Sequence, residues 1–391
     1  MTSATTAADC LASARSLRAT LARRAADHDR AGVFPAADFD DLREAGLLGL
    51  MAPSALGGAG AGFAEYAEVA MALAEGNGAT ALVFNMHCSI VGALASLPDE
   101  MARALGVPDS YFAMRDRVLF DAARGSFYAV AMSERGSGSR LSGVTTTYEP
   151  KGSDGYLVRG SKTFCSGAGH ADAYLVAARN GELVSYFLVP SGPGIDVEQT
   201  WDSLGMRATG SQDVHLDVVT PHDSLLGGVE GLTLLLAQVM PQWLVASYAA
   251  VYVGVAQSAV DHAVRHVQER GLGHLPAVRA RIGRADAQVA AARLVVVEAA
   301  RRVDADPGTP ETNRWVWRAK LTAGETAMDV AASMLEAAGT SATRKGHPLE
   351  RIYRDARCGS LQPATSDVCA DWLGMSALGL DADSGSAVPR W

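Results

Sequence analysis

Lysine is scarce in this chain. Only four of its 391 residues are lysine, and acidic residues outnumber basic ones, which gives a net charge of −9 at pH 7. A surface that binds nucleic acid needs clustered lysine and arginine side chains to neutralise phosphates. The charge balance therefore argues against a nucleic-acid partner.

Cysteine is sparse as well. The five cysteines are odd in number, scattered and never spaced as CxxC: Cys10, Cys88, Cys165, Cys358 and Cys369. This usage predicts reduced thiols in a cytoplasmic protein, with no disulfide framework and no thiolate metal site.

Several catalytic and binding motifs are missing. The glycine-rich stretch 57–62 follows a predicted helix rather than a strand and lacks Gly-Lys-Ser/Thr, so we interpret it as a turn and not as a phosphate loop. His262 and His266 have a spacing that can bind zinc, but no third ligand accompanies them, and we expect a solvated helix face and no metal. Without a Gly-x-Ser-x-Gly motif, serine-hydrolase chemistry has no support.

Membrane and export signals are also lacking. The first 30 residues are rich in alanine and arginine and have no continuous apolar stretch of the kind found in secretory signals. We expect no apolar run long enough to cross a membrane. With 48% hydrophobic and 20% charged residues, the composition is that of an ordinary globular protein.

The patterns that are present change twice along the chain. Apolar spacings of three and four predict helices over residues 1–125. Short β-prone runs separated by Gly, Pro, Asp and Asn follow over 126–225, and they indicate an antiparallel barrel or sandwich, of which we favour a β-barrel. Helical patterns return over 226–391. We therefore predict an α+β protein with three domains.

The last domain carries the longest helical patterns. A mostly apolar stretch, 232–260, is too apolar on all sides for a surface helix. Further helices are predicted near 276–304, 311–338 and 366–380. Four long helices favour a four-helix bundle with up-down packing.

A specific signature begins at Tyr128. The stretch "YAVAMSERGSGSR" reads as a strand that ends in Ser-Glu and turns through a loop of glycine and serine. It resembles the signature of the acyl-CoA dehydrogenase superfamily, and the likeness continues through "FDDLREAGLLGLMAPSALGGAG", "GYLVRGSKTFCSGAGHADAYLVAAR", "WDSLGMRATGSQDVHLDVVTPHDSLLG" and "AAGTSATRKGHPLERIYRDAR". Glycines in such a loop let backbone N–H groups approach a flavin and its phosphate. The resemblance implies that fold and a flavin cofactor.

The resemblance also assigns flavin-binding roles. Met132 and Ser133 match residues at the pyrimidine edge of the flavin ring, and Ser139 matches a serine near the phosphates. Phe164 matches a tryptophan that packs on the flavin. Ser166 matches a threonine whose hydroxyl faces flavin N5.

Two further positions concern the cofactor's far end. Arg270 matches an arginine that reaches the diphosphate from a neighbouring subunit, which implies a homo-oligomer, a dimer or tetramer. Gly339 matches the first glycine of a Gln-x-x-Gly-Gly motif, but Glu336 stands in place of the glutamine. A carboxylate near a diphosphate is unfavourable. The cofactor is therefore FAD or FMN.

The family's catalytic base is missing. Dehydrogenation removes a proton next to a thioester carbonyl, which requires a positioned carboxylate of raised pKa. In most members this glutamate lies nine residues after the Arg that matches Arg354, and here that position is Pro363. The alternative position falls within 240–245, which also contains no acid.

The sequence therefore favours a branch of the superfamily that includes dibenzothiophene monooxygenases and amino-sugar N-oxygenases. Enzymes of that branch use reduced flavin, which a separate reductase supplies. The reduced flavin reacts with O2 and forms a C4a-hydroperoxide, which oxygenates a small nucleophilic substrate. "FCSGAG" (164–169) looks like that branch. We expect His87, Ser166 and Gln362 to be catalytic.

Other interpretations remain open. His87 can instead be a satisfied core histidine, and Gln362 a structural residue. The enzyme can be an acyl-CoA or acyl-carrier dehydrogenase or oxidase with a relocated base. A non-catalytic flavin-binding paralogue is disfavoured by the retained Ser133, Ser139 and Ser166.

Overall fold

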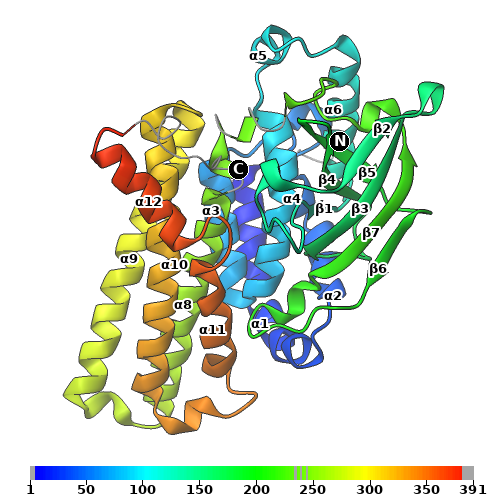
Figure 1. Cartoon of the computed structure of the whole chain (residues 1–391). Helices are drawn as coiled ribbons and strands as arrows, with labels where there is room; N and C mark the ends of the chain where they lie inside the picture. Colours follow the sequence, from blue (N-terminus) through cyan, green and yellow to red (C-terminus); the bar gives the residue numbers. More distant parts are fainter. Residues whose placement is uncertain (1–4, 233–235, 238–239, 244, 381–391) are drawn as a thin grey trace.

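The computed structural model describes residues 5–232, 236–237, 240–243 and 245–380. A curved sheet lies to one side of the molecule, long helices form the other side, and the N-terminal helices lie between them (Figure 1). The N-terminal helices are α1 (Ala7–Ala31), α2 (Ala36–Glu44), α3 (Phe63–Gly76), α4 (Gly78–Ser96), α5 (Asp99–Ala104) and α6 (Asp109–Ala123).

Local signals set several of these helix ends. The Thr6 hydroxyl caps α1 while the Asp9 carboxylate accepts from the Thr6 backbone N–H, a reciprocal pair that satisfies two free donors. Gly32 ends the helix at φ 65°, a conformation that glycine adopts readily. A break falls at Gly76-Asn77-Gly78, where α3 ends at Gly76 and the Asn77 side chain caps α4.

The middle of the chain forms one seven-stranded sheet in the order β1-β4-β2-β3-β7-β6, with β5 paired to β4. Its strands are β1 (Tyr128–Ala131), β2 (Thr147–Pro150), β3 (Tyr156–Cys165), β4 (Ala173–Asn180), β5 (Leu183–Pro190), β6 (Ile195–Glu198) and β7 (Gln212–Thr220). The expectation of a purely antiparallel sheet is wrong, because β4 pairs in parallel with both β1 and β2. Among the described strands, no pairing joins β6 back to β1 or β5.

The C-terminal part is a helical bundle built around α10, which contacts the other four long elements. These helices are α8 (Ala246–Glu269), α9 (Pro276–Ala305), α10 (Pro310–Ala338), α11 (Pro348–Arg357) and α12 (Ser366–Ala377). Helices α9, α10 and α12 agree with the sequence prediction to within a few residues. Their alanine-rich buried faces allow close helix packing.

The long apolar stretch 232–260 is not one helix. Residues 233–235, 238–239 and 244 of that stretch lie outside the described part, and α8 begins only at Ala246. Pro241–Trp243 forms a short 3-10 turn before it. A proline lacks the N–H that an α-helix interior requires, which accounts for a helix start after it.

Two helical segments are long and apolar enough to span a membrane, which corrects the expectation from the sequence: Gly78–Ser96 and Pro241–Glu269. In both, nearly nine tenths of the apolar window is buried inside the protein. Helix α4 lies between α3, α8 and β1 and packs on all sides. Such a high buried fraction is typical of helices in the core of a globular protein.

Candidate active site

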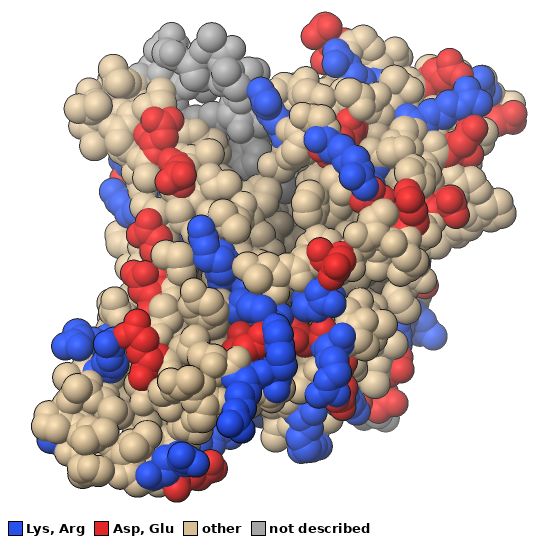
Figure 2. Space-filling view, turned by 60° about the horizontal axis from the view of Figure 1, so that its bottom comes forward, with Lys and Arg blue, Asp and Glu red and all other residues tan. Residues whose placement is uncertain are grey.

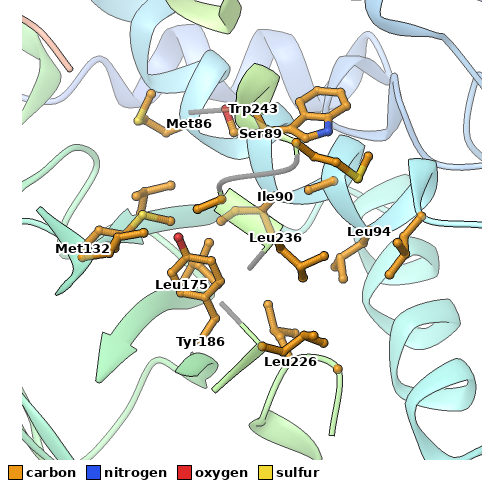
Figure 3. A pocket seen from close by; sticks show the side chains of 18 of the residues that line it. Met86, Ser89, Ile90, Leu94, Met132, Leu175, Tyr186, Leu226, Leu236 and Trp243 are labelled. Carbon is orange, nitrogen blue, oxygen red and sulfur yellow. The ribbon is translucent and has the colours of Figure 1, made fainter. Parts of the chain in front are cut away.

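A cavity of ≈ 190 Å³ opens between α4, the sheet and the segment that precedes α8. Its wall combines side chains from all three domains of the sequence prediction, and Figure 3 shows them converging on one space. Apolar groups dominate, among them Ile90, Leu94, Leu175, Leu226 and Leu236. The site thus depends on how distant segments pack.

No acidic side chain lines this cavity within the described residues. Pro363, at the position of the family's usual base, is part of the wall. The alternative location for a base lies in the segment before α8, and in 226–245 the one acid is Glu230. The Glu230 carboxylate accepts a hydrogen bond of 2.8 Å from the Tyr148 hydroxyl, and Glu230 does not line the cavity.

Three of the predicted flavin residues come together at one side of the cavity: Met132, Ser133 and Ser139. Met132 and Ser133 follow directly after β1. The backbone N–H of Thr163 donates to the Ser133 carbonyl at 2.9 Å, which holds β3 against this turn. The structure therefore brings the 132–139 loop and the end of β3 side by side.

Phe164 has an unusual conformation at the end of β3. Its φ is 56°, rare for a residue with a β-carbon, and its side chain is 60% exposed although aromatic. The ring meets Trp201 edge-on at 5.7 Å between centroids. Phe164 follows Thr163, whose backbone binds Ser133 of the cavity wall, and an exposed flat ring is suited to cover a planar ligand.

Ser166 ends a chain of three buried hydroxyls whose donor directions can be worked out. The Thr209 hydroxyl donates to the Met206 carbonyl at 2.9 Å, because a carbonyl only accepts. Each hydroxyl has one hydrogen, so Ser211 donates to Thr209 at 2.7 Å and Ser166 donates to Ser211 at 2.8 Å. The Ser166 oxygen is left with lone pairs for any further partner, so it presents an acceptor.

Helix α11 fixes the start of this hydroxyl chain. The Asp355 carboxylate accepts from the Met206 backbone N–H at 2.6 Å, and Arg354 donates to the Leu204 carbonyl at 3.0 Å. Arg354 also pairs with Asp29 of α1 at 2.6 Å. Figure 2 shows basic and acidic side chains interspersed over the middle of one face of the protein. This arrangement is expected where Arg and Asp side chains form ion pairs.

His87 lies in the core and not in the cavity wall. It is fully buried, its Nε2 lies 2.7 Å from the Leu48 carbonyl, and its Nδ1 accepts the Tyr128 backbone N–H at 3.1 Å. These contacts define the neutral tautomer with hydrogen on Nε2. Burial lowers its pKa to about 4. Both ring nitrogens are occupied, so the structure favours the core interpretation over the catalytic one.

Gln362 does not line the cavity either. Its Oε1 accepts from the Tyr252 hydroxyl of α8 at 2.7 Å. Its backbone carbonyl and that of Gly359 accept from the Lys320 amine at 3.0 and 2.8 Å. The catalytic role predicted for Gln362 therefore has no geometric support. These contacts hold the loop so that the neighbouring Pro363 faces the cavity.

Arg270 and Gly339 are not brought to the cavity within one chain. Arg270 follows the last residue of α8 and Gly339 follows the last residue of α10, and Figure 1 shows these two ends together at the lower end of the bundle. Glu336 pairs with Arg281 at 2.5 Å, which neutralises the carboxylate that was expected to oppose a diphosphate. Their roles toward a cofactor stay predictions.

The side chains near Ser133 fit a flavin. The Ser137 hydroxyl is buried without a hydrogen-bond partner in the described residues, and a group added at Gly136 or Gly138 would meet only open space. Arg135 at the start of the loop pairs with Asp213, whereas the exposed Arg140 forms no ion pair among the described residues, which leaves a cation available for a phosphate. With the exposed Phe164 ring, these groups offer a flat contact, hydrogen bonds and charge.

Several functional residues were missed from the sequence. Thr209 and Ser211 lie beyond β6 and meet Ser166 only in three dimensions, although the Ser/Thr content of "RATGSQ" was visible. Lys320 is a rare lysine in an apolar helix face, a signal that was available. Tyr186 carries no sequence signal that distinguishes it from other strand tyrosines.

The chain was compared with known families and proteins. It matches three acyl-CoA dehydrogenase domains: the N-terminal domain over 11–104, the middle domain over 129–219 and the C-terminal domain over 243–377. It is 32% identical to L-evernosamine nitrososynthase of a Micromonospora species, covering 93% of this chain and 88% of that protein. It is 29% identical to the putative acyl-CoA dehydrogenase YdbM of Bacillus subtilis, covering 90% and 92%.

Solved structures agree with this placement. FMN-bound TdsC from Paenibacillus sp. A11-2 superposes with a TM-score of 0.82 at 27% identity and covers 95% of this chain and 97% of that one. Butyryl-CoA dehydrogenase of Megasphaera elsdenii has a TM-score of 0.85 at 22% identity over 95% and 98%, which shows the shared fold. The chain thus belongs to the acyl-CoA dehydrogenase family. It is a flavin-dependent oxidoreductase of that family.

Proposed function

We propose that this enzyme is a flavin-dependent monooxygenase that uses reduced flavin and O2 to oxygenate a small nucleophilic substrate. The observation that carries the proposal is the cavity wall, where proline occupies the usual position of the base and no carboxylate is present among the described residues. Abstraction of an α-proton needs such a base. Oxygen transfer to a nucleophile does not.

The relatives support the same choice. One solved relative is titled dibenzothiophene monooxygenase, and two sequence relatives are named nitrososynthases, at 31% and 32% identity. A putative acyl-CoA dehydrogenase also matches, at 29% identity. We propose that this chain works in the cytoplasm with a separate flavin reductase and as a homo-oligomer.

The chain's own residues would act as follows. Ser133, Ser139 and Arg140 would hold the flavin at the 132–139 loop, and Phe164 would cover one face of its ring. When bound and reduced, the flavin supplies the electrons that activate O2. Ser166 would accept a hydrogen bond from the cofactor. The apolar wall excludes water, which protects a reactive oxygen species from hydrolysis.

Stopped-flow mixing of the purified protein with reduced FMN tests the proposal. In air-saturated buffer, we expect a transient absorbance that differs from both oxidised and reduced FMN. Under nitrogen, butyryl-CoA should leave the absorbance of bound oxidised flavin unchanged. Bleaching by butyryl-CoA, with no transient in air, would overturn the proposal.

A matched pair of variants sharpens this test. Pro363→Glu restores a carboxylate to the cavity wall. In Pro363→Gln the side chain has nearly the same shape as that of glutamate but carries no charge. We expect any bleaching by butyryl-CoA to appear only in Pro363→Glu. Equal bleaching in the native protein would reveal a base elsewhere.

A further inference from the structure

Two polar groups in the cavity wall have no hydrogen-bond partner. The Tyr186 hydroxyl and the Trp243 Nε1 are both buried, and neither makes a hydrogen bond within the described residues. Leaving a buried donor without a partner is costly, so native proteins seldom do it without a reason. A ligand in the cavity can supply the missing acceptor.

Tyr186 is well placed for this role. It lies on β5, and its backbone is fixed by the N–H of Leu226, which donates to the Tyr186 carbonyl at 2.9 Å. Figure 3 shows its side chain among the cavity residues with the hydroxyl oxygen at the tip. Burial raises the pKa of Tyr186, so the hydroxyl keeps its proton and acts as a donor.

Two other hydroxyls of the wall, those of Ser89 and Tyr248, already use their hydrogens within the protein. The Ser89 hydroxyl donates to the Asn85 carbonyl at 2.8 Å, so its hydrogen is already used. The Tyr248 hydroxyl donates to the Met86 sulfur at 3.7 Å. Tyr186 is therefore the strand residue with a donor free for a ligand.

The charge of the wall limits the ligand. No Lys, Arg, His, Asp or Glu lines the cavity in the described part of the chain. An ionised ligand group would lose its hydration there without gaining a counter-charge. An apolar cavity of ≈ 190 Å³ is somewhat larger than the ~150 Å³ apolar cavity that binds benzene in another protein.

We propose that the substrate is a neutral, mostly apolar ring compound whose one hydrogen-bond acceptor is bound by the Tyr186 hydroxyl. This inference rests on the proposed oxygenation and names its substrate class. It separates the chain from relatives whose structures are titled with dTDP or a dTDP-sugar. A phosphorylated sugar would bring charges that this wall does not match.

Calorimetric titration of the protein saturated with oxidised FMN tests the inference. Quinoline and naphthalene are nearly the same size, but only quinoline has an acceptor nitrogen, and it is uncharged at pH 8. We expect quinoline to bind about fivefold more tightly, the effect of one neutral hydrogen bond. Tyr186→Phe should abolish that preference, and Tyr248→Phe, the matched control from the same wall, should retain it.

Three results would overturn the inference. They are equal affinity of the native protein for both probes, a quinoline preference that survives in Tyr186→Phe, and tighter binding of dTDP than of either ring compound. The titration uses neither reduced flavin nor turnover. A failure of the proposed oxygen chemistry would therefore leave this result unaffected, and the two can fail separately.

Discussion

At the scale of single residues, hydrogen-bond directions decide what each side chain can offer. His87 and Ser166 were both predicted to be catalytic from their positions in the sequence. Both nitrogens of His87 are occupied by backbone groups, whereas Ser166 uses its hydrogen within the protein and keeps its lone pairs. The same kind of accounting gives three predictions.

His87→Gln should keep the enzyme active. An amide can accept from the Tyr128 N–H and donate to the Leu48 carbonyl, as the neutral imidazole does. We expect the rate of the transient absorbance with reduced FMN and O2 to change less than threefold or so. A loss of about a hundredfold in a folded variant would restore the catalytic interpretation.

His87 should also make stability depend on pH. Because its folded pKa, about 4, lies below the unfolded value, the folded state binds fewer protons, and stability falls as the pH drops from 6.5 toward 4. Between pH 7 and pH 5, denaturant unfolding should show the native protein losing about 2 kcal/mol relative to His87→Gln. Identical pH profiles would contradict the buried neutral ring.

Ser211→Ala should change which flavin state is preferred. Without the Ser211 hydroxyl, the hydrogen of the Ser166 hydroxyl becomes free to donate. Oxidised flavin gains from this change because its N5 accepts a hydrogen bond, whereas the N5–H of reduced flavin donates one. We expect the ratio of FMN to reduced-FMN dissociation constants to fall about fivefold. Ser139→Ala is the control and should weaken both states alike. An unchanged ratio in Ser211→Ala would show that Ser211 does not determine whether the Ser166 hydroxyl donates to or accepts from the flavin.

At the scale of elements, helix α10 fixes the loop that carries Pro363. The Lys320 amine is fully buried and faces two carbonyls, those of Gly359 and Gln362, without a carboxylate partner. Desolvation lowers its pKa to about 8. Above that pH the amine is mainly neutral, and its two hydrogens match the two carbonyls.

Lys320→Met tests this anchor. The folded pKa lies below that of the unfolded chain, so the contribution of Lys320 to stability is complete only above about pH 10.5 and is lost as the pH falls through 8. Between pH 8 and pH 10, the free energy of unfolding of the native protein should rise by about 2 kcal/mol relative to Lys320→Met. Parallel profiles of the two proteins would contradict the prediction.

At the scale of the whole molecule, the predicted cofactor residues are divided between two places. Met132, Ser133 and Ser139 line the cavity, but Arg270 and Gly339 lie at the far end of the bundle. We propose that a second copy of the chain brings its Arg270 to the flavin. We also propose that the domain boundaries lie near residues 125 and 225.

Mixed oligomers test that arrangement. Ser139→Glu and Arg270→Glu should each abolish flavin binding alone. In a random mixture of two-subunit units, one site of each hybrid is intact, so about a quarter of the sites should recover. Recovery would be measured by FMN fluorescence quenching after joint refolding. No recovery, or normal binding by Arg270→Glu alone, would show that Arg270 does not act across subunits.

The sequence by itself determined the domain order, the bounds of α9 and α10 to within a residue, and the absence of a base at the position of Pro363. These follow from local periodicity, capping residues and residue identity, which need no partner in space. The 132–139 loop was also identified, because its glycines and serines are adjacent in sequence.

Only the tertiary structure decided the rest. It paired β4 in parallel with β1 and β2, it engaged His87 and Gln362 in hydrogen bonds outside the cavity wall, and it joined Ser166 to Ser211. It also left the Tyr186 hydroxyl without a hydrogen-bond partner among the described residues. A hydrogen bond depends on which groups from distant segments meet and in which direction, and residue order along the chain does not specify either.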